Sequence, residues 1–270
     1  MKINSLKFNN STIHKMYHGN ELVNKIGDAF TYMEASGDTP TPPTPVPYAE
    51  QYLTFDIISA GTINTDYIID YSLDNGVTWS ATDGTSISVS AGDKVLWKGL
   101  YNDGFGTNIF SGSTATFNIE GNIMSLIYGD NFIGQTTITP SFAFAYLFMQ
   151  LNVVSAENLI LPATTFAEGC YYRMFGDCPN LTTAPVLPAT TLAENCYSYM
   201  FRGCHSLNYI KCLATDISAN NCTYRWVSGV SGVVASGTFV KAASMNDWTT
   251  GREGIPEGWT VQNDSDDWEQ

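Results

Sequence analysis

Apolar and polar residues alternate along residues 13–17 and 21–26, on either side of His18-Gly19-Asn20. This alternation predicts two strands, and the glycine between them allows a tight turn, so the pattern predicts a β-hairpin. A segment of about 36 residues without disulfides or metal rarely folds alone. We therefore expect residues 1–36 to be an anchoring hairpin that docks onto another protein; the alternative is a flexible tail. The apolar docking side chains are Ile13, Tyr17, Leu22, Val23 and Ile26.

A proline-rich spacer and a β-rich segment follow. Five prolines within residues 40–47 predict an extended polyproline II linker over residues 37–47. Residues 48–128 then contain short apolar stretches separated by turn signals, of which Asn75-Gly76 is the strongest because both residues accept positive φ. Further turn signals lie at Ala91-Gly92-Asp93 and Gly121-Asn122. This pattern predicts an all-β, sandwich-like domain.

The third segment, residues 129–262, contains an internal repeat. Residues 161–181 recur 26 residues later as residues 187–207, with decayed copies before and after them. A fixed period in the twenties predicts a solenoid whose units stack on their neighbours. We expect a short α/β solenoid of 26-residue units with a C-terminal cap, followed by an acidic tail over residues 263–270. That tail is a solvated segment in our interpretation, with Ca²⁺ binding as the alternative.

Within each repeat, apolar residues lie four apart. Phe166, Cys170 and Met174 would share one face of a helix, and the second copy repeats the pattern, so a short helix is predicted in each unit. Stacking then aligns the cysteines of successive units. We expect them to be buried thiols that pack as small apolar groups, with oxidised pairs as the alternative. The aligned sets are Cys170, Cys196 and Cys222, and Cys178 with Cys204.

Composition excludes several classes of function. There are 26 acidic residues against 12 basic ones, giving a formal charge of −14 and an isoelectric point near 4.3. Nucleic acids and anionic membranes both need clustered Lys and Arg, so neither is an expected partner. No apolar run reaches the length of about 18 residues that a membrane span requires. The start of the chain lacks the apolar core of a secretory signal, so we expect folding in a cytoplasm.

The repeat motifs resemble a known family. The pattern F-x-x-C-x-x-L, at residues 175–181 and 201–207, resembles the BspA-type leucine-rich repeat of Bacteroidales surface proteins. Residues 71–96 look like the β module that commonly precedes this repeat, and residues 13–23 are similar to N-terminal segments of phage virion proteins. The resemblance implies adhesion or surface display, as on virions of crAss-like Bacteroides phages, which assemble in the host cytoplasm.

No catalytic constellation accompanies these motifs. The three histidines form no metalloprotease motif, and neither a hydrolase elbow nor a P-loop occurs. Cys204 and His205 are adjacent, but adjacency in sequence is not the geometry of a nucleophile and its base. We therefore expect no enzyme, no cofactor and no metal site. A pair of carboxylates for glycoside hydrolysis remains the enzymatic alternative.

Aromatic and arginine side chains on the repeats are the candidate ligand contacts. They lie off the predicted apolar helix face, where exposed rings can stack on the C–H faces of sugars; the alternative is that they cover neighbouring repeats. The candidates are Tyr171, Tyr172, Tyr197, Tyr199, Tyr224, Arg173 and Arg202.

The leading hypothesis is a phage virion protein, a head fibre, tail fibre or capsid decoration subunit that aids attachment to host-surface or gut glycans. Its other expected partners are virion proteins, bound through residues 1–36, and further copies of itself in a homodimer or homotrimer. The alternatives are a bacterial cell-surface leucine-rich-repeat adhesin and a polysaccharide depolymerase.

Overall fold

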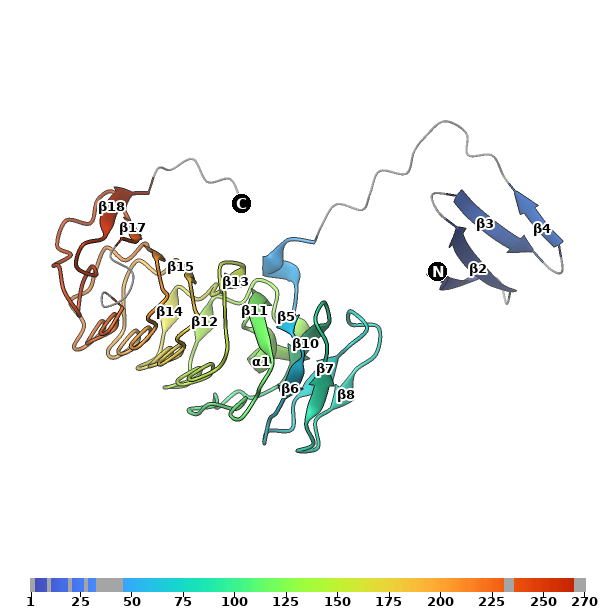
Figure 1. Ribbon diagram of the computed structural model, residues 1–270, viewed down its shortest axis with the longest axis horizontal. Helices are drawn as coiled ribbons and strands as arrows, with labels where there is room; N and C mark the ends of the chain where they lie inside the picture. Colours follow the sequence, from blue (N-terminus) through green and yellow to red (C-terminus); the bar gives the residue numbers. More distant parts are fainter. Residues whose placement is uncertain are drawn as a thin grey trace. The chain divides into compact units, whose positions relative to one another are not determined.

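The computed structural model describes residues 46–230 and 236–264, and the backbone of four strands within residues 3–32 (Figure 1). Contacts divide the chain into two compact units, Met1–Pro45 and Val46–Gln270. The predicted spacer falls at this division, although its residues 37–45 lie outside the described residues. The boundary predicted at residue 128 lies inside the second unit, where one hydrophobic core extends from Leu53 to Trp259.

The N-terminal unit contains a four-stranded antiparallel sheet with its strands in chain order. The pairing of Tyr17 with Leu22 confirms the predicted hairpin, and a further strand flanks it on each side. The side chains proposed for docking belong to these strands, but they lie outside the described part of the chain. The strands are β1 (Ile3–Phe8), β2 (Ser11–His18), β3 (Glu21–Ile26) and β4 (Ala29–Tyr32).

The second unit begins with a six-stranded sheet in the order β13-β11-β5-β10-β7-β8 and a separate two-stranded pair, β6-β9. The helical segments among the described residues are short: η1 (Tyr48–Glu50), α1 (Ser125–Tyr128) and η2 (Gly129–Asn131). A β-rich fold is therefore confirmed. The strands are β5 (Leu53–Ser59), β6 (Gly61–Ile63), β7 (Asp70–Ser72), β8 (Ser80–Ala81), β9 (Ile87–Val89), β10 (Lys94–Lys98), β11 (Thr116–Asn122) and β13 (Leu159–Ile160).

The predicted turns have different outcomes. Asn75 and Gly76 adopt φ of 59° and 81° between the paired strands β7 and β8, so this hairpin is confirmed. The chain also turns at Gly92, but β9 then pairs with β6 while β10 pairs with β5 and β7. The turn predicted at Gly121 is wrong because β11 runs through it. A Cβ on Gly121 would lie 2.1 Å from the carbonyl oxygen of Tyr52, so glycine allows two chain segments to approach closely.

The repeat-bearing part of the chain contains parallel strands. Four of them pair in the order β15-β16-β17-β18, and Thr183 pairs with Tyr209, which is 26 residues later. Figure 1 shows the successive units side by side, coloured from green to red. The strands are β12 (Thr137–Ile138), which pairs with β14 (Thr165–Phe166), and β15 (Thr183–Leu187), β16 (Tyr209–Cys212), β17 (Thr238–Lys241) and β18 (Thr260–Asn263).

The helices predicted in the repeats are wrong. Residues 169–177 instead form consecutive four-residue turns, in which every fourth residue has a left-handed backbone. The φ angles are 60° at Gly169, 52° at Arg173 and 58° at Asp177. Within each turn one N–H donates to the carbonyl three residues earlier, as Tyr172 does to Gly169 at 2.9 Å. We call these segments the repeat turns; they comprise residues 142–151, 169–178, 195–204 and 221–230.

Hydrogen bonds between neighbouring repeat turns replace those of a helix. Alternate N–H groups donate to the next repeat, as from Gly169 to the carbonyl of Glu194 and from Arg173 to that of Ser198, both at 2.9 Å. Buried backbone groups must be satisfied, and here the neighbouring copy satisfies them. An apolar residue at every fourth position fits a ribbon of four-residue turns as well as it fits a helix.

The C-terminal boundary also differs from the prediction. Strand β18 continues to Asn263, and the carboxylate of Asp264 lies 2.8 Å from Lys211 Nζ. Asn263 and Asp264 therefore belong to the folded unit and not to the tail. Residues 265–270 of the predicted acidic tail lie outside the described residues.

Candidate functional site

A row of partly buried tyrosines crosses the repeat turns. Tyr146, Tyr172, Tyr199 and Tyr224 come from four successive repeats, and their ring centroids are separated by 5.3, 5.7 and 5.3 Å. Every contact is edge-to-face, the geometry that aromatic quadrupoles favour. We call these four residues the tyrosine row. Because each repeat adds one ring, the row extends in the direction in which the repeats stack.

Two of the predicted ligand contacts are instead core residues. Tyr171 is 1% exposed and Tyr197 is fully buried, and their rings stack 6.1 Å apart. The prediction is wrong for this pair because each repeat turn buries two or three neighbouring residues, so Tyr171 and Tyr197 lie in the core beside Cys170 and Cys196. Neither hydroxyl has a hydrogen-bond partner among the described residues, and burial raises the pKa of both phenols well above the usual value.

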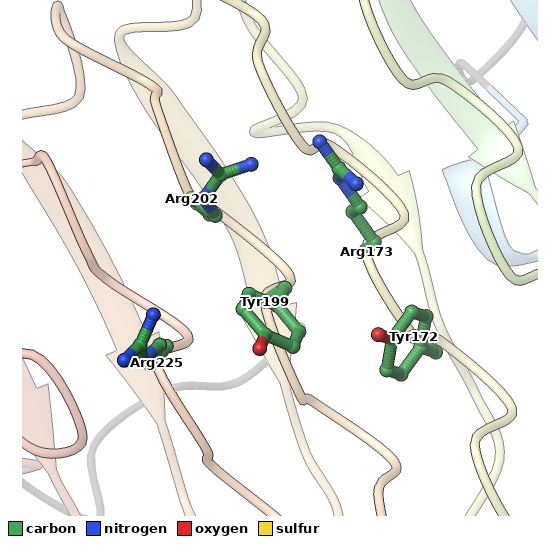
Figure 2. Close-up of a pocket in the computed structure, with 5 residues that line it drawn as sticks. All are labelled: Tyr172, Arg173, Tyr199, Arg202 and Arg225. Atoms are coloured by element: carbon green, nitrogen blue, oxygen red, sulfur yellow. The ribbon is translucent and has the colours of Figure 1, made fainter.

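The surface beside the tyrosine row holds an open pocket of 280 Å³. Figure 2 shows its side chains on three neighbouring turns of the chain. We call it the arginine pocket; it is lined by Tyr172, Arg173, Tyr199, Arg202 and Arg225. Four of these five residues are among the predicted contacts.

Positive charge exceeds negative charge in the arginine pocket. Asp177 Oδ2 lies 2.6 Å from Arg173 Nη2 and 3.6 Å from Arg202 Nη1, so two guanidinium groups share one carboxylate. Arg225 forms no ion pair with any described residue; its guanidinium carbon lies 5.3 Å from the ring centroid of Tyr224. The whole chain has only four arginines, of which Arg252 alone lies outside this pocket.

Arg225 is the pocket residue that the sequence prediction omits. Tyr224-Arg225 follows Tyr172-Arg173 by 52 residues, or two periods of the repeat. Extending the repeat alignment into its third, decayed copy would therefore have found it. Arg173 and Arg225 occupy equivalent left-handed positions, with φ of 52° and 50°.

The Cys204 and His205 pair has no catalytic geometry. The Cys204 thiol is buried and donates a hydrogen bond to the carbonyl of Phe175 at 3.0 Å, and burial raises the pKa of this thiol well above the usual value. The His205 ring is exposed, and its Nδ1 lies 2.8 Å from the carbonyl oxygen of Gly229. A buried neutral thiol beside an exposed imidazole is not an activated nucleophile.

A second polar cluster is internally satisfied. Asp130 Oδ1 lies 2.8 Å from both Lys98 Nζ and the Tyr52 hydroxyl, and Lys98 Nζ lies 4.3 Å from the centroid of the Trp79 ring. Burial and the neighbouring Asp130 carboxylate raise the pKa of Tyr52 to about 12. Because each charged group has a partner, this cluster stabilises the strands around it and presents no free group to a ligand.

Within residues 46–230 and 236–264, no group of three or more His, Cys, Asp or Glu side chains could hold a metal ion. No described helix combines the length and the apolar character needed to cross a membrane. Comparison of the chain with models of known families, with curated proteins and with solved structures gave no match.

Proposed function

We propose that this chain is a non-enzymatic phage virion protein, a head fibre, tail fibre or decoration subunit that displays a ligand-binding surface. The observation that carries the proposal is the division at Pro45 between a small β unit and a larger repeat-bearing unit. A fibre or decoration subunit needs one part that joins the particle and another that faces outward. Residues 1–36 would join other virion proteins, and the arginine pocket would face host-surface or gut glycans.

We further propose that residues 129–264 form a short leucine-rich-repeat solenoid. Parallel pairing of β15 to β18 supports this proposal, as do the hydrogen bonds between successive repeat turns. A stacked-repeat architecture gives an extended surface on which equivalent side chains form rows. The tyrosine row is such a set of equivalent or adjacent positions.

Mass spectrometry of purified virions tests the assignment. We expect peptides of this chain in particles purified on a density gradient, at a stoichiometry comparable to that of known structural proteins, and labelling of intact particles by an antibody against residues 46–264. The control is the soluble fraction of the same lysate. Detection in the lysate with none on particles would contradict the proposal, and the same chain on the surface of uninfected cells would identify an adhesin.

The depolymerase alternative has its own test. Incubation of the purified protein with Bacteroides capsular polysaccharide would release no oligosaccharide if the chain only binds. Release of reducing ends would contradict the non-enzymatic proposal, and replacement of the responsible carboxylate pair would then abolish it.

A further inference from the structure

We propose that the arginine pocket binds a linear acidic oligosaccharide, with guanidinium groups holding its carboxylates and tyrosine rings contacting its sugar rings. This inference deepens the proposed function, because it specifies the chemical class of glycan. It concerns the five pocket residues together with Tyr146, the next member of the tyrosine row.

The charge of the pocket indicates an anion. The pocket is lined by three guanidinium groups, and two of them share the single carboxylate of Asp177, so positive charge is in excess there although the formal charge of the chain is −14. The contact between Arg202 and Asp177 is long, at 3.6 Å, and Arg225 has no carboxylate partner among the described residues. Arg202 and Arg225 are therefore available to an incoming anion. A guanidinium donates two parallel hydrogen bonds to a carboxylate, which favours this planar anion.

The arrangement of rings and charges indicates a saccharide. One equivalent position of the repeat carries Tyr146, Arg173, Tyr199 and Arg225 in turn, all with left-handed φ between 50° and 63°. Arginine and tyrosine therefore alternate in the direction in which the repeats stack. A polymer that carries carboxylates on successive or alternate sugars presents anionic groups and apolar C–H faces in the same direction. Tyrosine supplies a flat apolar ring for those faces and a hydroxyl for sugar hydroxyls.

Nucleic acid fits the pocket less well. Binding to a phosphate backbone depends on many cationic contacts, and the large negative charge of the remaining chain opposes a polyanion of high charge density. An acidic peptide would satisfy the arginines but would leave the tyrosine rings without a matching periodic partner. An acidic peptide and a polysaccharide that carries sulfate instead of carboxylate groups are therefore the two competing ligands to compare.

Calorimetric titration of the full chain with oligogalacturonate tests the inference. We expect saturable binding that weakens as salt concentration rises, and no binding of a neutral malto-oligosaccharide. The changes Arg225→Gln and Arg202→Gln should each lower the association constant about tenfold, the usual effect of losing a charge-assisted hydrogen-bond pair. Arg225→Lys retains the charge but loses the planar fork, and should also weaken binding. Arg252→Gln is the matched control, and should leave binding unchanged.

The competing outcomes are distinct. Equal binding by wild type and both pocket variants, with thermal unfolding unchanged, would overturn the inference, as would a neutral oligosaccharide that binds equally well. If only poly-L-glutamate bound, the ligand would be an acidic peptide; if only dextran sulfate bound, the ligand would be a sulfated polysaccharide. Either result overturns the proposal. Particles that carry this chain while the chain binds no oligogalacturonate would refute this inference and leave the virion proposal intact.

Discussion

At the scale of single residues, the cysteine thiols of the repeats fall into two groups. Cys178 and Cys204 donate hydrogen bonds to the carbonyls of Phe148 and Phe175, both at 3.0 Å. Cys170 and Cys196 are equally buried, but neither thiol donates a hydrogen bond to a described residue. All six cysteines are buried with free thiols, which confirms the packing role predicted from their alignment. A hydroxyl in place of the thiol would therefore have a carbonyl acceptor at Cys178 and Cys204, and none among the described residues at Cys170 and Cys196.

Serine substitutions should separate these two groups. We expect Cys196→Ser to lower the free energy of unfolding by about 1–3 kcal/mol, because a buried hydroxyl would lack an acceptor. Cys204→Ser should cost less, since the carbonyl of Phe175 can accept its hydrogen bond. Urea unfolding of both variants, with Cys196→Ala as the control for lost volume, measures the difference. Equal losses for the two serine variants would refute this distinction.

Removing a buried tyrosine hydroxyl should not destabilise the protein, in contrast to adding a buried hydroxyl at Cys196. Phe144 occupies the position equivalent to Tyr171 and Tyr197 in the first repeat turn and stacks on Tyr171 at 5.9 Å, so the core accepts a ring without a hydroxyl. We expect Tyr197→Phe to leave the free energy of unfolding unchanged or to raise it by up to about 1 kcal/mol. Thermal and urea unfolding measure it. A loss above about 1 kcal/mol would show that the hydroxyl has a partner.

Burial of the thiols also predicts alkaline instability. Burial raises the pKa of Cys178 and of Cys212 from 9.0 to about 12. Above pH 9 the unfolded chain releases these protons while the folded chain retains them, so stability falls as pH rises from 9 towards 12. It should be constant with respect to these groups below pH 9. Urea unfolding between pH 7 and 11 measures the slope, and Cys178→Ala should reduce it; an unchanged slope in that variant would contradict the assignment.

At the scale of elements, local sequence predicts a structure only where one conformation fits the pattern. Asn75-Gly76 forms its turn because both residues accept the positive φ that the chain adopts in the loop between β7 and β8. Gly121 carries the same local signal, but the decisive fact is the nearness of Tyr52, which is 69 residues away in the sequence. The predicted helices fail for a related reason: a four-residue period fits both a helix and the repeat turns, and the hydrogen bonds that decide between them come from the neighbouring repeat.

A glycine substitution tests the close approach within β11. We expect Gly121→Ala to lower the free energy of unfolding by more than about 1 kcal/mol, because alanine disfavours φ of 81° and its Cβ would lie 2.1 Å from the carbonyl oxygen of Tyr52. Gly92→Ala is the control, since it has φ of 89° with no atom within 4 Å of an added Cβ. The difference between the two losses measures the steric clash. Similar losses would mean that backbone strain alone accounts for the effect.

At the scale of the whole molecule, the division at Pro45 separates two units that differ in size and in their capacity to bury a hydrophobic core. The unit that begins at Val46 has its own continuous core, whereas the N-terminal unit is a small four-stranded sheet. A sheet of that size has unpaired edges and little capacity to bury a core, so we expect association with another chain to stabilise it. We infer that assembly depends on the N-terminal unit, and that the unit from Val46 onward folds without it.

Truncation tests whether assembly depends on the N-terminal unit. We expect the full chain to form a homodimer or homotrimer in solution, because several copies strengthen weak attachment and closed symmetric assemblies are common. A chain that begins at Val46 should be monomeric by light scattering and should keep the thermal unfolding midpoint of the larger unit. Limited proteolysis of the full chain should then cut before Tyr48 and leave this fragment intact. A monomeric full chain at tens of micromolar, or a fragment that still associates, would place the assembly contacts outside the N-terminal unit and transfer the anchoring role to the repeat-bearing unit itself.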